Sequence, residues 1–399
     1  MHADLISQHL ERLLNEPMES VRERQANTLE HLIGSLDGPL VLFGASHLGR
    51  RALALLKELG CPPCAFLDNN PALWGQSIES VPVFSPAQFV AQYTGELPAV
   101  ICTIWSGHIH DCMADRLRPL YELGFKRIAL FGHLAWRYPA QLLPHYCMDL
   151  PEHVLGEASA IWRAFALLGD QASRKLFVAD VEWRLHLNHD LLPVSSPLKI
   201  YFDAAFSTHC ADEVVFDLGA FNGDTAEGYL QSGRSFREYH CFEPVALNFT
   251  ALTTNLARLA KPGMHAHRMA VGDSQGEVMI EASNGPSSRV GLGDEPVPMT
   301  TLDHLVAQGI HPTFIKIDIE GFEPQCLAGG RQLIREHQPL IAVSVYHQQN
   351  HLWQIALQLH DYNDAYRFSL CPHVSDGWDL VLYAVPADRV PQHSPSEPS

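Results

Sequence analysis

The pattern that most constrains this chain is an alternation of short apolar runs with amphipathic stretches, which occurs in two separate series. The first series extends from about residue 39 to residue 140 and contains the runs VLFGA, CAFLD, AVICTIW and RIALFG. The second begins at Glu213 and contains EVVFDLG, YHCFEP, HAHRMAV, TFIKIDIEG, LIAVSVYH, AYRFSLC and DLVLYAV. Such alternation is typical of strands joined by covering helices, and hence of parallel sheets. The sequence therefore predicts an α/β protein with two doubly wound domains.

The same pattern divides the 399 residues into five expected segments. They are an N-terminal helical segment (1–38), a Rossmann-like domain (39–140), a helical connector (141–210), a second α/β domain (211–386) and a tail rich in proline and serine that we expect to be disordered (387–399).

An excess of acidic residues narrows the range of partners. The chain has 27 lysines and arginines against 45 aspartates and glutamates, which gives a formal net charge of −18. Because such a charge repels phosphate backbones and anionic lipid, we expect neither nucleic acid nor a membrane surface as a partner. No apolar run approaches the ~18 residues of a membrane span, and the first residues lack the apolar core of a signal peptide. We expect a cytoplasmic protein, and the sequence leaves open whether it forms a homo-oligomer.

A glycine loop, Gly219-Ala220-Phe221-Asn222-Gly223, follows the first strand of the second series. With Asp217 its spacing is D-x-G-x-x-x-G, which differs from the G-x-G-x-x-G loop that holds a pyrophosphate. The next strand ends in Glu243, where an acid can accept both hydroxyls of a ribose. A glycine loop and a ribose acid without the pyrophosphate pattern favour an adenosine ligand that lacks phosphates. S-adenosylmethionine is such a ligand, and its cationic groups suit nearby carboxylates.

Two later strands of this series also end in charged residues. The third ends in Ala270-Val-Gly-Asp273, so Asp273 is expected to border the adenine. The fourth reads Lys316-Ile-Asp318-Ile-Glu320, which puts three charges on one face of a central strand, where charges need partners. If the fourth strand neighbours the first, Lys316 can pair with Asp217 beneath the ligand. The alternative is a structural ion pair without any role in binding.

Six blocks in this half of the chain carry a resemblance to a known family. DLGAFNGDT, CFEP, AVGD, TTLD, FIKIDIEGFE and SVYH…LW…VLYA occur in this order between about Tyr201 and Val385. Together they resemble the FkbM family of class I methyltransferases. The resemblance implies a seven-stranded sheet whose last strand is antiparallel, S-adenosylmethionine as the methyl donor, and, as in most members of the family, an oxygen atom as the acceptor.

Carried over by position, the resemblance implies roles for individual residues. The cofactor loop would include Asp217, Gly219, Ala220 and Gly223, the ribose would contact Glu243, the adenine would lie near Asp273, and the methyl end would hold Asp318 and Glu320. One position departs from the family pattern, because His351 stands where an acid is expected. No role is carried over to His351.

Methyl transfer to a hydroxyl requires that the acceptor be positioned and that its proton be removed. Asp318, Glu320 and His347, which follows the fifth strand at the same edge of the sheet, are the candidate catalytic residues. The alternative for His347 is a loop histidine bonded to backbone. His347 and His351 stand four residues apart, like half of a metal site, but no H-E-x-x-H pattern accompanies them, and we expect no metal.

The first series contains its own glycine loop, Gly44-Ala-Ser46-His-Leu-Gly49, and Asp68 ends the next strand. This is the layout of a dinucleotide fold, but Ser46 replaces the middle glycine and would crowd a pyrophosphate. The run FLDNNPALWGQSIESVPVFSP resembles the Rossmann-like domain that often precedes sugar-modifying enzymes. Two interpretations stay open: binding of a nucleotide or sugar nucleotide, and a structural or dimer-forming domain.

The function that these patterns favour is methyl transfer from S-adenosylmethionine to a hydroxyl of a sugar, glycan or secondary metabolite, so the expected partner is a small-molecule or glycan acceptor. A nucleotide-sugar oxidoreductase or epimerase acting through the first domain is one alternative, but it would need a Tyr-x-x-x-Lys or similar base, and the sequence shows none. A non-catalytic nucleotide sensor is another, and the intact Asp217, Glu243 and Asp318 argue against it.

Overall fold

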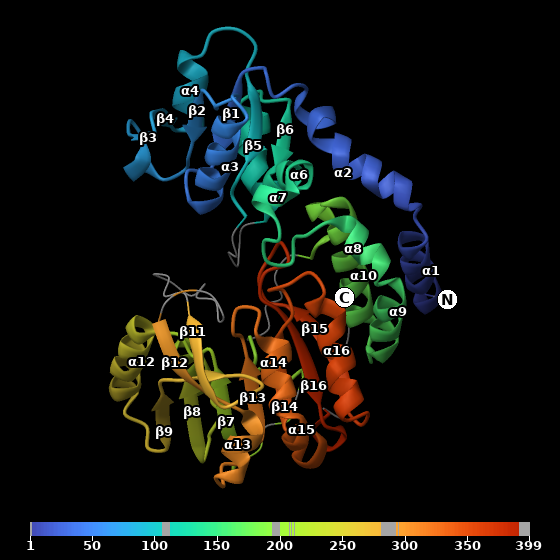
Figure 1. Cartoon of the computed structure of the whole chain (residues 1–399), viewed down its shortest axis with the longest axis vertical. Helices are drawn as coiled ribbons and strands as arrows, with labels where there is room; N and C mark the ends of the chain where they lie inside the picture. Colours follow the sequence, from blue (N-terminus) through green and yellow to red (C-terminus); the bar gives the residue numbers. More distant parts are fainter. Residues whose placement is uncertain are drawn as a thin grey trace. The chain divides into compact units, whose positions relative to one another are not determined.

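The computed structural model of the chain describes residues 2–105, 112–193, 200–206, 208, 210, 212–280, 293 and 295–390, which form two compact units (Figure 1). Unit 1 comprises Met1–Ala158, Val178–Ser195 and Val374–Trp378, and unit 2 comprises Ser159–Phe177, Ser196–His373 and Asp379–Ser399. Neither unit is continuous in sequence. The segment expected as a helical connector, residues 141–210, contributes to both units.

Unit 1 is built around a six-stranded sheet in the order β3-β4-β2-β1-β5-β6. All neighbouring strands are parallel except β3 and β4, which form an antiparallel hairpin at one edge. The doubly wound pattern predicted for residues 39–140 is confirmed. The strands are β1 Leu40–Phe43, β2 Ala65–Leu67, β3 Ser77–Ile78, β4 Val81–Phe84, β5 Ala99–Cys102 and β6 Ile128–Leu130.

The helices of this unit follow from amphipathic stretches and from local capping. In α3, for example, Leu48, Leu55 and Leu56 are buried on one face, and at α4 the hydroxyl of Ser85 accepts the backbone N–H of Gln88. The helices are α1 His2–Leu14, α2 Met18–Ile33, α3 His47–Glu58, α4 Pro86–Gln92, α5 Met113–Glu122, α6 Phe131–Arg137, α7 Pro139–Leu142 and α8 Pro151–Gly156, with short 3₁₀ helices η1 Pro71–Leu73 and η2 His189–Leu191. Helix α10, Gln171–His186, begins in unit 2 and ends in unit 1.

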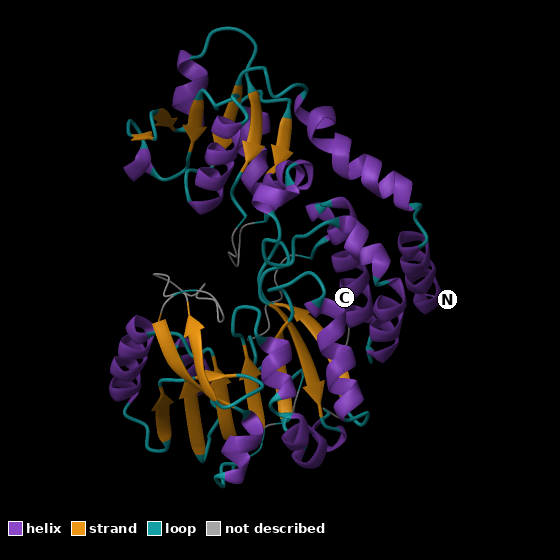
Figure 2. Cartoon of the chain, in the orientation of Figure 1, coloured by secondary structure: helices purple, strands orange, loops and turns teal. Residues whose placement is uncertain are grey.

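Unit 2 contains a seven-stranded sheet in the order β15-β16-β14-β13-β7-β8-β9 (Figure 2). From β14 to β9 in this order the strands run parallel, and β16 is antiparallel to both of its neighbours, β14 and β15. The predicted seven-stranded sheet with an antiparallel last strand is confirmed. The strands are β7 Val214–Leu218, β8 Glu238–Phe242, β9 Met264–His267, β13 Phe314–Ile317, β14 Leu340–Ser344, β15 Arg367–Pro372 and β16 Leu380–Val385.

Helices cover this sheet because its central strands are apolar on both faces. Strands β7, β14 and β16 are buried at every position, as expected of strands between two helical layers. The chain order runs outward from β7 through β8 to β9 and then returns to β13, so right-handed crossovers place the helices of the two halves on opposite faces. The helices are α9 Ala158–Leu167, α11 Asp224–Gln231, α12 Ala246–Leu259, α13 Leu302–Ala307, α14 Glu323–Ala328, α15 Arg331–His337 and α16 His351–Tyr362, followed by the 3₁₀ helix η3 Ala387–Arg389.

A second, three-stranded sheet corrects one expectation about the third strand. That strand was predicted to run from His265 to Val271 and to end at Asp273, but β9 stops at His267. Ala270–Val271 forms a separate strand, β10, which pairs with β12 (Glu295–Thr300), and β12 pairs in turn with β11 (Gly276–Ile280). The run from His265 to Val271 is continuous in sequence, but its two halves pair with different partners, and strand pairing depends on residues distant in sequence.

The turn between β15 and β16 belongs to unit 1 although both strands belong to unit 2. Asp376 in this turn accepts hydrogen bonds from the guanidinium of Arg116 at 2.8 Å and from the backbone N–H of Met113 at 3.1 Å. The side chains of the ion pair are each 2% exposed. Trp378 packs beside Trp105 and Tyr146. The turn therefore belongs to the core of unit 1.

Among the residues that the structure describes, no helix is both long enough and apolar enough to span a bilayer.

Removal of the Asp376 carboxylate should destabilise unit 1. We expect Asp376→Ala to lower the free energy of unfolding of this unit by about 3–5 kcal/mol, because the buried guanidinium of Arg116 would lose its counter-charge. Urea unfolding monitored by tryptophan fluorescence measures this loss of stability, because Trp378 lies in the turn and Trp105 packs beside it. Glu96→Ala is the control: that carboxylate is 85% exposed and 3.8 Å from Arg127, so no measurable change is expected. Equal midpoints for the two variants would contradict the prediction.

Candidate functional site

The glycine loop predicted after the first strand of unit 2 joins β7 to α11 at the carboxyl edge of the sheet. Gly219 has a φ of +76°, and a Cβ there would lie 1.9 Å from the carbonyl oxygen of Asp318. Only glycine permits both this conformation and this approach. Gly223, with a φ of +88°, closes the loop and precedes α11. Phe221 also has a positive φ, +45°, which is a constrained conformation of the kind found at binding sites.

Ala220 and Glu243 hold this loop against β8. The backbone N–H groups of Gly219 and Ala220 both donate to the carbonyl of Phe242 at 3.0 Å, and Ala220 is fully buried. Glu243 is 5% exposed and accepts the N–H of Phe221 at 3.0 Å on one oxygen. Its other oxygen accepts the N–H of Val245 at 2.9 Å. Burial raises the pKa of Glu243, against these hydrogen bonds. The predicted ribose acid thus supports the loop.

Lys316 and Asp217 are direct register partners on β13 and β7. Nζ of Lys316 lies 3.1 Å from Oδ1 of Asp217 and donates to the carbonyl oxygens of Leu218 at 3.2 Å and Gly219 at 2.6 Å. The hydroxyl of Tyr239 donates to the other oxygen of Asp217 at 3.2 Å. Burial alone would lower the pKa of Lys316, but nearby carboxylates, Asp217 foremost, raise it. The predicted pair is present, and it lies beneath the loop, where Asp217 is fully buried.

Asp318 and Glu320 lie just beyond the end of β13, and their side chains are 23% and 16% exposed. The hydroxyl of Tyr201 donates to Oδ2 of Asp318 at 2.9 Å. Nε2 of His347 lies 3.3 Å from Oδ1 of Asp318 and 3.8 Å from Oε1 of Glu320. The structure thus brings together the three candidate catalytic residues, Asp318, Glu320 and His347. Glu320 has a φ of +56°, so the chain has left the strand there and the two-residue alternation no longer holds.

Glu323, which sequence reasoning did not single out, organises this edge. Its carboxylate is fully buried, and Oε1 accepts the N–H of Ile319 at 3.0 Å and the N–H of Gly321 at 3.3 Å. The same oxygen lies 2.8 Å from Nδ1 of His347. Nδ1 of His351 lies 3.3 Å from Oε2. The block K-I-D-I-E-G-x-E contains Glu323, and its glutamate after a glycine turn is the signal that could have identified it.

The charge of His347 follows from its surroundings. Both ring nitrogens face carboxylates, and the side chain is 1% exposed. Burial alone would lower the pKa of His347, but Glu323, Glu320 and Asp318 outweigh it and raise the pKa to about 10. A further carboxylate at the same edge, Asp379, was also missed from the sequence, and burial, reinforced by Asp318, raises its pKa to about 6.

No described contact joins the side chain of Asp273, predicted to border the adenine, to these groups. It is exposed and follows β10 of the small sheet, and its carboxylate accepts the hydroxyl of Ser274 at 3.2 Å. The backbone around it is tightly packed, since a Cβ on Gly329 would lie 1.9 Å from the carbonyl oxygen of Gly272.

The glycine loop of unit 1 is held by its own acid. Asp68 follows β2, and its two carboxylate oxygens accept the N–H of Ala45 and the N–H of Asn70, both at 2.7 Å. A Cβ on Gly49 would lie 2.0 Å from the carbonyl of Gly44, so this glycine serves close packing of helix on loop. Both carboxylate oxygens of Asp68 are thus bonded to backbone.

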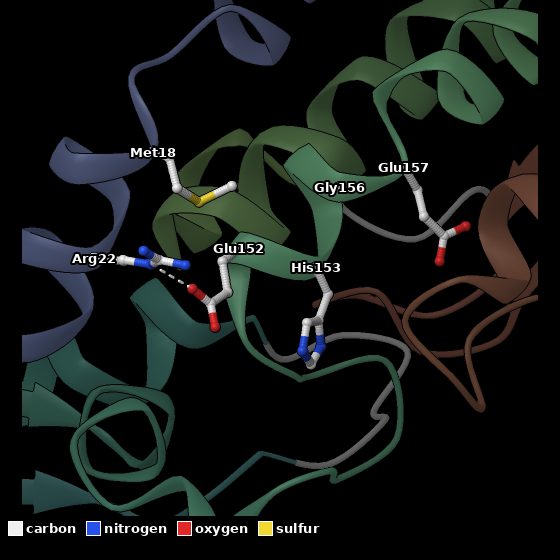
Figure 3. Close-up of a pocket in the computed structure, with 6 residues that line it drawn as sticks. All are labelled: Met18, Arg22, Glu152, His153, Gly156 and Glu157. Carbon is white, nitrogen blue, oxygen red and sulfur yellow. Dashed lines mark hydrogen bonds and ion pairs between the residues drawn. The ribbon is translucent and has the colours of Figure 1, made fainter.

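A pocket of about 390 Å³ in unit 1 lies beside α2 and α8 (Figure 3). It is lined by Met18, Arg22, Glu152, His153, Gly156 and Glu157. Nε of Arg22 donates to Glu152 at 2.7 Å, and the Arg22 side chain is 67% exposed. The pocket therefore contains an ion pair, Arg22 with Glu152, whose arginine is largely exposed. None of the predicted site residues lines this pocket.

Comparisons with known proteins agree with the sheet and the loop. Residues 217–370 match the family model described as methyltransferase FkbM domain, which confirms the resemblance for this segment. The chain is also similar to the crystal structure of methyltransferase FkbM from Methylobacillus flagellatus KT, with a TM-score of 0.73, 20% identity, and coverage of 96% of this chain and 98% of that chain. At this identity the likeness establishes a shared fold.

Weaker likenesses extend over less than half of the chain. A precorrin-6y C5,15-methyltransferase from Geobacter metallireducens GS-15 has a TM-score of 0.30 and 10% identity, and covers 44% of this chain and 81% of its own. An rRNA methylase from Streptococcus thermophilus has a TM-score of 0.28 and 12% identity, with coverages of 44% and 88%. No curated protein sequence matches the chain.

Gly219→Ala should damage unit 2 because the added Cβ meets the carbonyl of Asp318 and the φ of +76° disfavours any side chain. We expect a loss of at least about 2 kcal/mol in the free energy of unfolding. Gly228→Ala is the matched control, since nothing lies within 4 Å of a Cβ there and it sits inside α11. Chemical denaturation measures the free energy of unfolding of both variants and of the wild type. A stability of Gly219→Ala equal to that of Gly228→Ala would contradict the close approach.

Lys316→Met should lower the free energy of unfolding of unit 2 by about 3–5 kcal/mol, because it leaves Asp217 buried without a cation. The double variant Lys316→Met/Asp217→Asn should recover some of this loss, because it removes the stranded charge as well. A double-mutant cycle measured by denaturation gives the coupling between the two residues. Additive losses would show that the side chains do not interact.

Proposed function

We propose that unit 2, with its FkbM methyltransferase domain at residues 217–370, transfers the methyl group of S-adenosylmethionine to a hydroxyl of a sugar, glycan or secondary metabolite. The observation that supports this most directly is the convergence of the glycine loop, Glu243 and the carboxylates Asp318 and Glu320 at one sheet edge. In parallel sheets, ligands bind at the carboxyl ends of the strands, where the order of connection reverses. That reversal lies between β7 and β13.

The residues present fit the proposed cofactor in shape and in charge. The loop from Gly219 to Gly223 has three positive φ values and is held close against the sheet, which leaves backbone rather than side chains facing a ligand at its glycines. Glu243 accepts one described hydrogen bond on Oε2, so that oxygen retains a lone pair for a ribose hydroxyl. Asp217 would position the loop through Lys316 and would not touch the ligand. Asp273 would lie near the adenine, as its position in the family pattern implies.

The acceptor end would be formed by partly exposed carboxylates. When bound, S-adenosylmethionine supplies an electrophilic methyl group on a sulfonium. Asp318, held by Tyr201, and Glu320 would orient the acceptor hydroxyl and take its proton. His347 is less suited to that task, because both of its ring nitrogens face carboxylates and its side chain is 1% exposed. We assign it the role of positioning Asp318.

Glu243→Gln should weaken the binding of S-adenosylhomocysteine about 10- to 100-fold, the scale of a lost charge-assisted hydrogen bond. Isothermal titration calorimetry on the full chain measures the dissociation constant. Glu336→Gln, an exposed glutamate on α15, is the control and should bind as the wild type does. Absence of saturable binding by the wild-type protein would remove the cofactor assignment, and an unchanged constant in Glu243→Gln would remove the role of Glu243.

Asp318→Asn should keep the affinity for S-adenosylmethionine and lower turnover by ~10²-fold or more, as expected when a proton acceptor is lost. Mass spectrometry of a panel of hydroxylated sugars and glycans incubated with the enzyme identifies the acceptor and follows its methylation. Loss of cofactor affinity with turnover retained at saturation would instead make Asp318 a cofactor anchor.

A further inference from the structure

Three side chains at the carboxyl edge of unit 2 converge in a way that the methyl-transfer proposal does not require. Asp318, Glu323 and His347 each offer one possible ligand atom, and these atoms lie within 4.8 Å of one another. Two donors bound to one ion at ~2.2 Å are at most ~4.4 Å apart. The three groups therefore need to move little to share a cation.

The turn after β13 holds this arrangement in place. The N–H groups of Ile319 and Gly321 donate to Oε1 of Glu323, so the carboxylate is fixed by backbone that also carries Asp318. His347 follows β14, the neighbouring strand, and contacts Glu323 at 2.8 Å and Asp318 at 3.3 Å. Ligands fixed by hydrogen bonds to a rigid frame are typical of metal sites.

The two carboxylate oxygens of Glu323 face different histidines. Oε1 lies 2.8 Å from Nδ1 of His347, and Oε2 lies 3.3 Å from Nδ1 of His351, at the start of α16. The fully buried carboxylate is thus fixed from two sides, and Oε1 is the oxygen that contacts His347 in the cluster.

The negative charge of the cluster also favours binding of a cation. Asp318, Glu320 and Glu323 contribute three carboxylates, and the neighbouring Lys316 is paired with Asp217. An imidazole must be neutral to coordinate a cation, so a coordinating His347 would offset none of these negative charges at a largely buried place. A divalent cation would offset two of them. Carboxylate oxygens together with an imidazole suit manganese, iron, cobalt or zinc better than magnesium or calcium.

We propose that Asp318, Glu323 and His347 bind a divalent transition-metal cation at the acceptor end of unit 2. This goes beyond the methyltransferase assignment and does not depend on which acceptor is used. A cation there would hold and acidify a hydroxyl, and in that case Asp318 holds the cation while Glu320 remains as the proton acceptor. The spacing of His347 and His351 alone predicted no metal, because Glu323, which contacts both histidines, is not part of that spacing.

Manganese(II) is a suitable probe because it prefers oxygen and nitrogen ligands over the cysteines of the chain. The full-length protein, stripped of metal by a chelator and dialysed, is titrated with Mn²⁺ without S-adenosylmethionine or acceptor, and free Mn²⁺ is counted by electron paramagnetic resonance. We expect one saturable site per chain. Asp318→Asn and Glu323→Gln should each weaken binding at least tenfold, and Glu336→Gln should leave the dissociation constant unchanged.

Circular dichroism shows whether each variant folds. If a variant does not fold, the wild-type protein still tests the site: pulsed electron paramagnetic resonance of bound Mn²⁺ should show coupling to a nitrogen nucleus, the signature of an imidazole ligand. The proposal is overturned by absence of saturable binding below millimolar Mn²⁺, by equal dissociation constants in folded Asp318→Asn and Glu336→Gln, or by absence of nitrogen coupling. Because the binding of S-adenosylhomocysteine is measured in a separate calorimetric titration without added Mn²⁺, failure of the metal site leaves the cofactor assignment intact.

Discussion

The ion pair between Lys316 and Asp217 is the interaction on which the site in unit 2 depends. It joins the two central strands at register partners, and the same ammonium group binds the carbonyl oxygens that begin the glycine loop. Neither charge could be buried alone without a large loss of stability. Because the pair fixes β7 against β13, the loop meets the backbone of Asp318 at a distance that only glycine at position 219 allows.

Glu323 has a comparable role slightly further along the chain. Its carboxylate holds the backbone from Ile319 to Gly321 and contacts His347 from the neighbouring strand. The turn after β13 and His347, which follows β14, are thereby joined through a single buried residue. This explains why the partly exposed carboxylates, Asp318 and Glu320, lie beside the same imidazole, and it provides the geometry from which a cation site is proposed.

The two units share one architecture, including the way in which an acid supports the glycine loop. Each has a glycine loop after its first central strand and an acid after the next. Asp68 accepts the backbone N–H groups of Ala45 and Asn70, one on each oxygen, and Glu243 accepts those of Phe221 and Val245 in the same way. The difference between the two units lies in the loop, where Ser46 replaces the middle glycine of the dinucleotide pattern and would crowd a pyrophosphate.

The sequence by itself determined the two α/β sheets and the glycine loop, because apolar periodicity acts through short segments. It predicted the pairing of Lys316 with Asp217 only on the condition that their strands are neighbours, and the structure met that condition. Other features were decided only by the tertiary structure. Strand β10 lies outside the large sheet because it pairs with β12, which is distant in sequence. The turn that contains Asp376 belongs to unit 1 because Arg116 binds its carboxylate. Glu323 is central to the site because it contacts both the turn after β13 and His347 after β14. A local sequence pattern does not predict which residues from separate strands come into contact.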